Sequence, residues 1–143
     1  MRRITMIVVH CSATRCNQDY PVQQLFHDHV EVNHWRYIGY HYYIRRNGRV
    51  EETRPLERIG AHAKGYNAHS IGICYEGGLD EHGHYADTRT EAQKKTMEKL
   101  VVQLKQQFPT IVNILGHRDL PGVQKACPCF DATTLRPLLF MKP

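Results

Sequence analysis

Two apolar runs near opposite ends of this 143-residue chain have the length of β-strands, and each leads into a histidine. Residues 4–9 precede His10, and residues 111–115 come shortly before His117. In open α/β sheets, ligands gather at the carboxyl ends of the strands. If the two strands are parallel neighbours, both imidazoles lie in one crevice. Cys127, ten residues after His117, would return to the same crevice on the loop that follows.

The order of the other sequence signals predicts an α/β fold in a single domain, residues 1–143. Asn47-Gly48 is a strong signal for a type I′ turn between two antiparallel strands. Thr90 and Gln93 have the spacing of a capping box at the start of the longest predicted helix. The other expected elements are strands over 40–45, 49–53 and 71–75, a final short helix capped by Asp131, and a helix after Pro21 with Val22, Leu25, Phe26, His29 and Val30 on one face. We therefore expect a mixed central β-sheet flanked by helices.

Composition limits the partners that the chain can have. Lys and Arg exceed Asp and Glu by 19 to 14, a formal charge of +5, which favours an anionic partner such as nucleic acid or the bacterial cell wall. The basic residues do not gather in one helix or tail, so we expect no nucleic-acid partner. The apolar runs are far shorter than the roughly 18 residues that cross a bilayer, so we expect no membrane span.

The N-terminus and the cysteines bear on where the chain works. The first apolar run is too short for the core of a signal peptide, so we expect synthesis in the cytoplasm without a signal peptide. Any target outside the cell would then be reached by other means. Five cysteines are an odd number, and without a secretion signal they are predicted to be reduced thiols, one of them bound to a metal.

His10, His117 and Cys127 have the chemistry of a zinc site. Zinc prefers nitrogen and sulfur ligands, and three protein ligands leave a fourth position open for water, which is typical of a catalytic zinc. A zinc ion bound by two imidazoles and one thiolate is a weaker Lewis acid than one bound by three imidazoles. A water on it therefore needs other groups to help it lose a proton and to stabilise the oxyanion that forms. Lys125 and Tyr40 can supply a positive charge and a hydrogen bond to a developing oxyanion. Taken singly, each of these residues is more often an ordinary core or surface residue, and the spacing is not a compact zinc motif.

Four segments, in order along the chain, resemble one known family. They are VVHCSAT (8–14), IGYHYYIRRNGRVE (38–51), GAHAKGYNAHSIGICYEGG (60–78) and KACPCFD (125–131). Together they resemble the zinc-dependent N-acetylmuramoyl-L-alanine amidases, a group that includes the amidase-type phage lysozymes and the peptidoglycan-recognition proteins. The resemblance covers nearly the whole chain and is strongest to the phage lysozymes.

The resemblance implies a mixed β-sheet with flanking helices, one Zn2+ per chain in an open cleft, and hydrolysis of the amide between N-acetylmuramic acid and L-alanine in bacterial peptidoglycan. In this family the zinc ligands fall on His10, His117 and Cys127, the catalytic residues on Tyr40 and Lys125, and the substrate cleft on His62 and Asn67. Two features depart from the family. The stretch between His117 and Cys127 is slightly longer than in the phage members, and Cys16 and Cys129 have no counterpart role.

Three functions remain open at this stage. The first is a lytic enzyme, most similar to the phage type, that reaches the wall after holin-type release or delivery by a secretion machine. The second is a module that binds peptidoglycan without cutting it, and the presence of Cys127 argues against it. The third is an intracellular amidase that recycles wall fragments. We expect a monomer, and the sequence does not decide whether a polymerase or an immunity protein is a partner.

Overall fold

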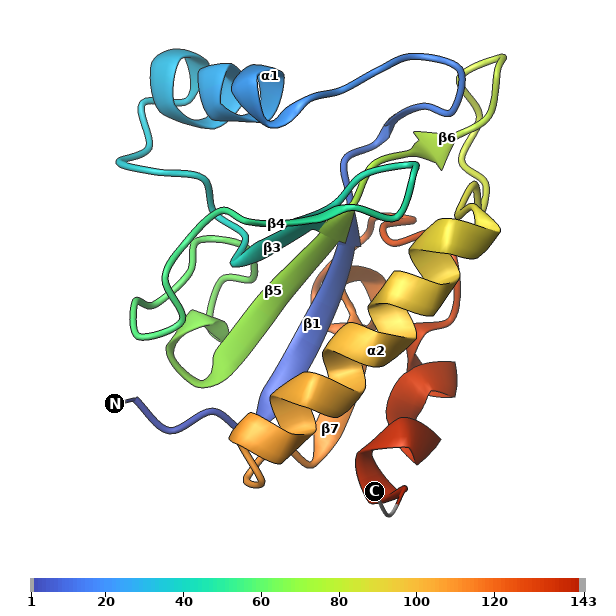
Figure 1. Cartoon of the computed structure of the whole chain (residues 1–143). Helices are drawn as coiled ribbons and strands as arrows, with labels where there is room; N and C mark the ends of the chain where they lie inside the picture. The colour runs from blue at the N-terminus through green and yellow to red at the C-terminus, as the bar shows by residue number, and fades with distance from the viewer. Residues whose placement is uncertain (1, 142–143) are drawn as a thin grey trace.

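The sheet at the centre of the protein combines parallel and antiparallel strands. In the computed structural model, which describes residues 2–141, its five strands lie in the order β4-β3-β5-β1-β7 (Figure 1). Their bounds are β1 Met6–Cys11, β3 Tyr42–Ile44, β4 Val50–Glu52, β5 Ser70–Tyr75 and β7 Asn113–Gly116. β1 is parallel to β5 and β7, β3 is parallel to β5, and β4 is antiparallel to β3. The predicted mixed sheet is confirmed, and the strands that lead to His10 and His117 are parallel neighbours, which is the condition on which the two imidazoles were expected to share a crevice.

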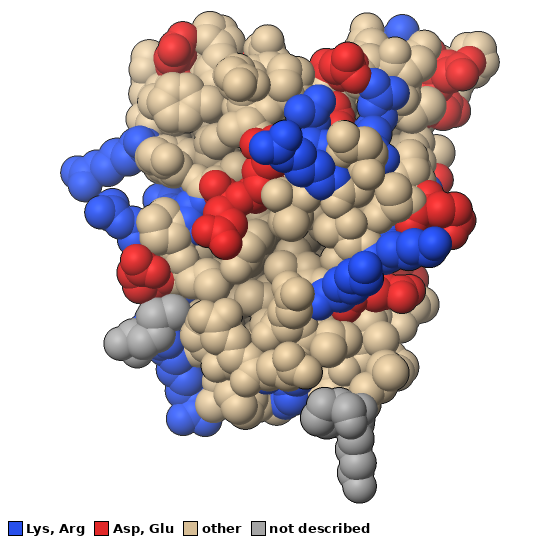
Figure 2. All heavy atoms as spheres, in the orientation of Figure 1, with Lys and Arg blue, Asp and Glu red and all other residues tan. Residues whose placement is uncertain are grey.

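The longest helix, α2 (Glu91–Gln107), crosses the face of the sheet that points to the viewer in Figure 1. The other elements are α1 (Val22–Phe26), the π-helical segment η1 (His27–Val32), the 3-10 segments η2 (Asn67–His69), η3 (His117–Asp119) and η4 (Ala132–Phe140), and a ribbon of β2 (Thr14–Arg15) with β6 (Gly78–Leu79). Within residues 2–141, no helix combines the length and the apolarity that crossing a membrane requires. Figure 2 shows basic and acidic side chains interspersed on the face that carries α2.

Alternation along β1 assigns its side chains to two faces of the sheet. Ile7 and Val9 belong to the core cluster that includes the buried side chains of α2, whereas Met6 and Val8 belong to a separate cluster. Successive side chains of a strand point to opposite faces. His10 therefore lies on the face of Met6 and Val8, away from α2.

A capping box begins α2, as the sequence predicts. The Thr90 hydroxyl accepts a hydrogen bond from the backbone N–H of Gln93 (3.1 Å), and the Gln93 side-chain oxygen accepts one from the N–H of Thr90 (2.9 Å). The amide nitrogen of Gln93 also donates to the carbonyls of Ile44 (3.2 Å) and Glu76 (2.9 Å). The same residue therefore starts the helix and attaches it to the chain around β3 and β5.

Replacing Thr90 by alanine is expected to lower the free energy of unfolding by about 1 kcal/mol, because an N–H of the first turn loses its acceptor. Urea denaturation of the purified protein measures the change. Lys95→Ala, on the exposed side of the same helix, is the control and is expected to stay within about 0.5 kcal/mol of the original protein. Equal stability of the Thr90→Ala and Lys95→Ala variants would show that the cap contributes nothing.

The turn at Asn47-Gly48 differs from the prediction. A type I′ turn needs positive φ at both central residues, but of these two residues only Gly48 has a positive φ (87°). The N–H of Gly48 donates to the carbonyl of Arg45 (2.8 Å), and the N–H of Arg45 donates to the carbonyl of Arg49 (2.8 Å). The type I′ prediction is therefore wrong, because Asn47 keeps a negative φ and the left-handed glycine lies at the end of the turn.

The first predicted helix is also interrupted. It continues as an α-helix only to Phe26 and then widens into η1. Phe26, the last residue of α1, is 38% exposed, while Leu25 and His29 are buried. The predicted apolar face therefore does not hold along its full length. The last predicted helix forms as η4 with Asp131 as its cap, but with 3-10 geometry and Pro137 inside it.

Candidate metal centre

The three predicted ligands come together although they lie far apart in the chain. His10 is in β1, His117 directly follows β7, and Cys127 lies on the next loop. One ligand atom from each of them falls within 4.8 Å of the other two. A hydrogen bond from the N–H of Arg118 to the carbonyl of Cys127 (2.8 Å) joins the two loop ligands. The parallel pairing of β1 with β7 thus positions both histidines, and the loop brings the thiol to them.

A glycine and a backbone N–H shape the surroundings of Cys127. A Cβ on Gly116 would lie 2.6 Å from the ring of Pro128, so only glycine lets the Cys127 loop approach the end of β7 this closely. The N–H of Cys11 lies 3.1 Å from the Cys127 sulfur and donates to it. A backbone donor of this kind stabilises a thiolate, the form in which cysteine binds metals.

The donor set matches the preferences of zinc. Two imidazole nitrogens and one sulfur are typical of zinc sites, and ideal bond lengths put neighbouring donors roughly 3.3–3.6 Å apart. The three ligand atoms lie within 4.8 Å of one another, so they would have to draw closer to hold the ion. His10 is buried, while His117 and Cys127 are partly exposed, so the cluster is open on one side.

Both histidines of the cluster favour the neutral form. Burial lowers the pKa of His10 well below its usual value, and His62, His117 and Lys125 lower it further. Burial and then the charge of Lys125 also lower the pKa of His117. Neutral imidazole is the form that binds a metal ion. The site is therefore set up for metal coordination near neutral pH.

Tyr40 and Lys125 lie beside this cluster. The ring centroids of Tyr40 and His10 are 5.0 Å apart, and burial raises the pKa of Tyr40 well above its usual value. The phenol therefore keeps its proton and can donate a hydrogen bond. Lys125 is exposed, and its ammonium is close enough to lower the pKa of both His10 and His117. Tyr40 lies two residues before β3 and not in the strand as predicted.

His62 and Asn67 take up positions behind the cluster. His62 is 9% exposed, and its Nδ1 lies 2.8 Å from Nε2 of His10. The side-chain oxygen of Asn67 accepts hydrogen bonds from the N–H groups of His62 (3.0 Å) and Ala63 (2.9 Å). Their expected contact with the substrate stays a prediction, since the contacts present in the structure are internal to the protein.

The sequence did not point to an aromatic row that leads away from the cluster. The ring of His29 packs in tilted orientations against Tyr40, with centroids 5.4 Å apart, and against Trp35 at 4.5 Å, and Trp35 is 40% exposed. Nδ1 of His29 accepts a hydrogen bond from the N–H of Gly39 (3.1 Å). Helical periodicity assigned His29 to an apolar face, whereas the π-helical turn places it beside Tyr40. The histidine inside an otherwise apolar stripe was the available signal.

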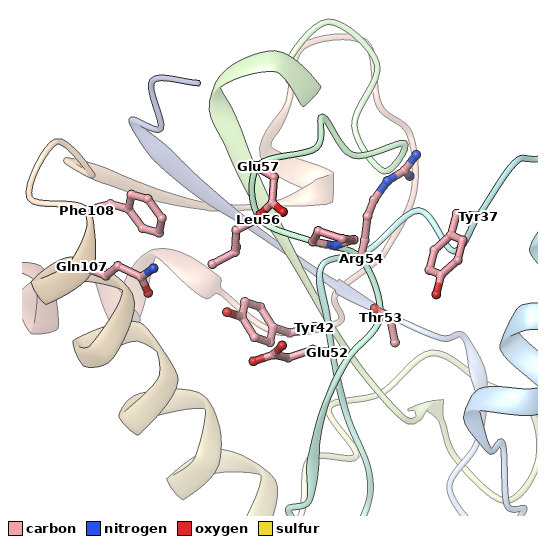
Figure 3. Close-up of a pocket in the computed structure, with 10 residues that line it drawn as sticks. Tyr37, Tyr42, Glu52, Thr53, Arg54, Leu56, Glu57, Gln107 and Phe108 are labelled. Atoms are coloured by element: carbon pink, nitrogen blue, oxygen red, sulfur yellow. The ribbon is translucent and has the colours of Figure 1, made fainter. Parts of the chain in front are cut away.

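A groove of about 550 Å³ lies elsewhere (Figure 3). It is lined by Tyr42 of β3 together with Gln107 and Phe108 at the end of α2. Tyr42 packs in the core cluster on the α2 side of the sheet, opposite the face of His10. None of the predicted ligand or catalytic residues lines this groove, so it is separate from the metal centre.

Comparison with known proteins gives the same protein family as the sequence resemblance. Residues 1–130 match the N-acetylmuramoyl-L-alanine amidase family. The chain is 41% identical over 127 residues to an endolysin of Klebsiella phage KP32, with 89% of this chain and 82% of the relative covered. The solved N-acetylmuramoyl-L-alanine amidase LysC from Clostridium intestinale superposes with a TM-score of 0.80 at 28% identity, covering 99% of this chain and 88% of that one.

A structure of PGRP-SA from Apis mellifera shares the fold alone, with a TM-score of 0.75 at 21% identity over 92% of this chain and 79% of that one. The fold and the cluster of histidines and thiol define a hydrolase with a candidate metal centre. The chain belongs to the N-acetylmuramoyl-L-alanine amidase family. The enzyme class that the resemblance implied is thereby confirmed.

Proposed function

We propose that this protein is a zinc-dependent amidase that hydrolyses the bond between the lactyl group of N-acetylmuramic acid and L-alanine in bacterial peptidoglycan. The observation that carries the proposal is the meeting of His10, His117 and Cys127 within 4.8 Å of one another. This donor set fits one zinc ion and leaves room for a further ligand. Family membership supplies the bond that is cleaved.

His10, His117 and Cys127 would hold the zinc ion, whose Lewis acidity would polarise the substrate carbonyl and make the attacking water easier to deprotonate. The phenol of Tyr40, protonated near neutral pH because burial raises its pKa, donates a hydrogen bond to the oxyanion. The ammonium of Lys125 stabilises the same negative charge from the solvent side. Either group can pass a proton to the leaving amine of L-alanine and regain one from the attacking water, which leaves the enzyme in its starting protonation state.

The proposal extends to where the enzyme acts. The similarity to an endolysin of a Klebsiella phage favours action on the cell wall after release from the cytoplasm. Holin-type release and delivery by a secretion machine both fit a chain of this kind. Activity on intact sacculi, compared with activity on soluble muropeptides, separates a lytic enzyme from one that recycles wall fragments.

Removal of the metal provides the direct test. Purified sacculi are digested with the protein, and the products are identified by chromatography and mass spectrometry. We expect release of stem peptides that carry a free L-alanine amine, with the glycan strands left intact. A zinc chelator is expected to stop the release, and added Zn2+ to restore it. Zinc-loaded protein that binds sacculi but releases nothing would instead indicate a peptidoglycan-binding module.

A further inference from the structure

His62 is a buried histidine to which the mechanism above gives no task. Its Nδ1 lies 2.8 Å from Nε2 of His10, and the two rings meet edge to face with centroids 4.9 Å apart and an interplanar angle of 89°. Two nitrogens at this distance share one proton in a hydrogen bond. The direction of that bond determines which nitrogen of His10 is available to a metal ion.

The chemistry of a metal ligand decides the direction. With Nε2 of His10 engaged by His62, Nδ1 is the nitrogen that remains for a metal. A neutral imidazole that binds through Nδ1 carries its proton on Nε2, so His10 donates and His62 accepts. The proton of His62 is then on its own Nε2, which lies 3.3 Å from the Ser70 hydroxyl. Each ring nitrogen of His10 and His62 is thus assigned as a metal ligand, a hydrogen-bond donor or a hydrogen-bond acceptor.

We propose that His62 is a positioning residue, which holds the metal ligand His10 in one tautomer and one ring orientation through the hydrogen-bonded series His10–His62–Ser70. Ligating histidines commonly give their second N–H to an acceptor, and that acceptor orients the ring and strengthens the ligand. The inference rests on the zinc amidase proposed above. It also gives His62 a task other than the substrate contact implied by the family resemblance.

The structure holds the His62 ring firmly. The side-chain oxygen of Asn67 accepts from the N–H groups of His62 and Ala63, which fixes the backbone of the loop. Gly72 of β5 lies against the ring, and a Cβ there would lie 2.7 Å from it. A side chain on Gly72 would therefore displace His62. Two residues of the family-like segment 60–78 thus confine His62, Asn67 through its backbone and Gly72 through its ring.

Variants of His62 show whether its side chain acts as a hydrogen-bond acceptor or only fills space. Leucine fills much of the same volume but accepts no hydrogen bond, whereas asparagine carries its oxygen on Cγ, where histidine carries Nδ1. His62→Leu is expected to raise the zinc Kd by about 10- to 100-fold, and His62→Asn by less than about threefold. Competition with a chromophoric chelator measures the affinity. The visible absorption bands of the Co2+-loaded protein are expected to shift in His62→Leu and to be retained in His62→Asn.

His41 provides the matched control. It is a buried histidine whose ring lies 5.9 Å from that of His62, and it bonds to the N–H of Gly72 (3.0 Å) and the carbonyl of Arg58 (2.8 Å) but not to His10. His41→Asn therefore disturbs the same region without removing the acceptor for His10. Its zinc Kd is expected to match that of the original protein, so a loss specific to His62→Leu reports the hydrogen bond.

A measurement on the unmodified apo protein avoids any variant that fails to fold. Imidazole 15N NMR is expected to show the proton on Nε2 in both His10 and His62. A proton on Nδ1 of His10, or an unchanged zinc Kd in a folded His62→Leu protein, would overturn the positioning role. Failure of the proposed function looks different: the original protein would then bind no zinc or release no stem peptides, whatever stands at His62.

Discussion

Cys127→Ala is expected to remove both the bound zinc and the amidase activity. The sulfur is one of three donors within 4.8 Å, and two imidazoles alone leave the ion too weakly held to persist through purification. Loss of the metal removes several kcal/mol of transition-state stabilisation, so kcat/KM should fall by at least about 10³-fold. Metal analysis of the purified protein and the release of stem peptides from sacculi measure the two effects.

Cys16→Ala is the control for this substitution. Cys16 is a partly exposed free thiol on the stretch between β2 and α1, outside the metal cluster. That variant should keep about one zinc per chain and full activity, and circular dichroism should show that both variants are folded. A Cys127→Ala protein with normal zinc content and normal activity would remove the thiolate from the proposed site and with it the proposed mechanism.

Much of the fold could be predicted because local patterns and long-range packing agree. The apolar run before His10 forms an interior strand of the sheet, between β5 and β7, and the stripe of α2 is buried through Met97, Leu100, Val101 and Leu104. The type of the turn at Asn47 and the geometry of the first helix were not predicted correctly. A dipeptide preference does not reveal that Asn47 keeps a negative φ, and helical periodicity does not reveal that a helix widens after Phe26.

From the sequence, the proximity of His10 and His117 followed only on the condition that their strands are parallel neighbours, and their role as ligands stays a prediction. A strand end predicts where His10 and His117 lie once the strands are known to be parallel, and the structure brings both together with Cys127. The contact between His10 and His62 could not be inferred from strand ends in this way. The two residues are 52 positions apart, and the loop that carries His62 has no periodicity from which the direction of its ring follows.

Lys125→Ala is expected to separate zinc binding from turnover. Lys125 is exposed, and its charge lowers the pKa of His10 and His117, so removing it takes away a repulsion and does not weaken metal binding. The same change removes a stabiliser of the oxyanion, and losing one such group reduces kcat by about 10²- to 10³-fold. Zinc content should stay at about one per chain while stem-peptide release falls.

Lys99→Ala, on the exposed side of α2 and across the sheet from the metal cluster, controls for the loss of one positive charge. It should retain full kcat, because attraction to the anionic wall depends on the total charge, whereas oxyanion stabilisation depends on position. NMR titration of the apo protein should show the pKa of His117 rising in Lys125→Ala and staying unchanged in Lys99→Ala. Full turnover in Lys125→Ala would mean that Lys125 stabilises no oxyanion, and an equal loss in the two variants would mean that it acts only through net charge. Tyr40 would then be the one remaining oxyanion donor among the predicted catalytic residues.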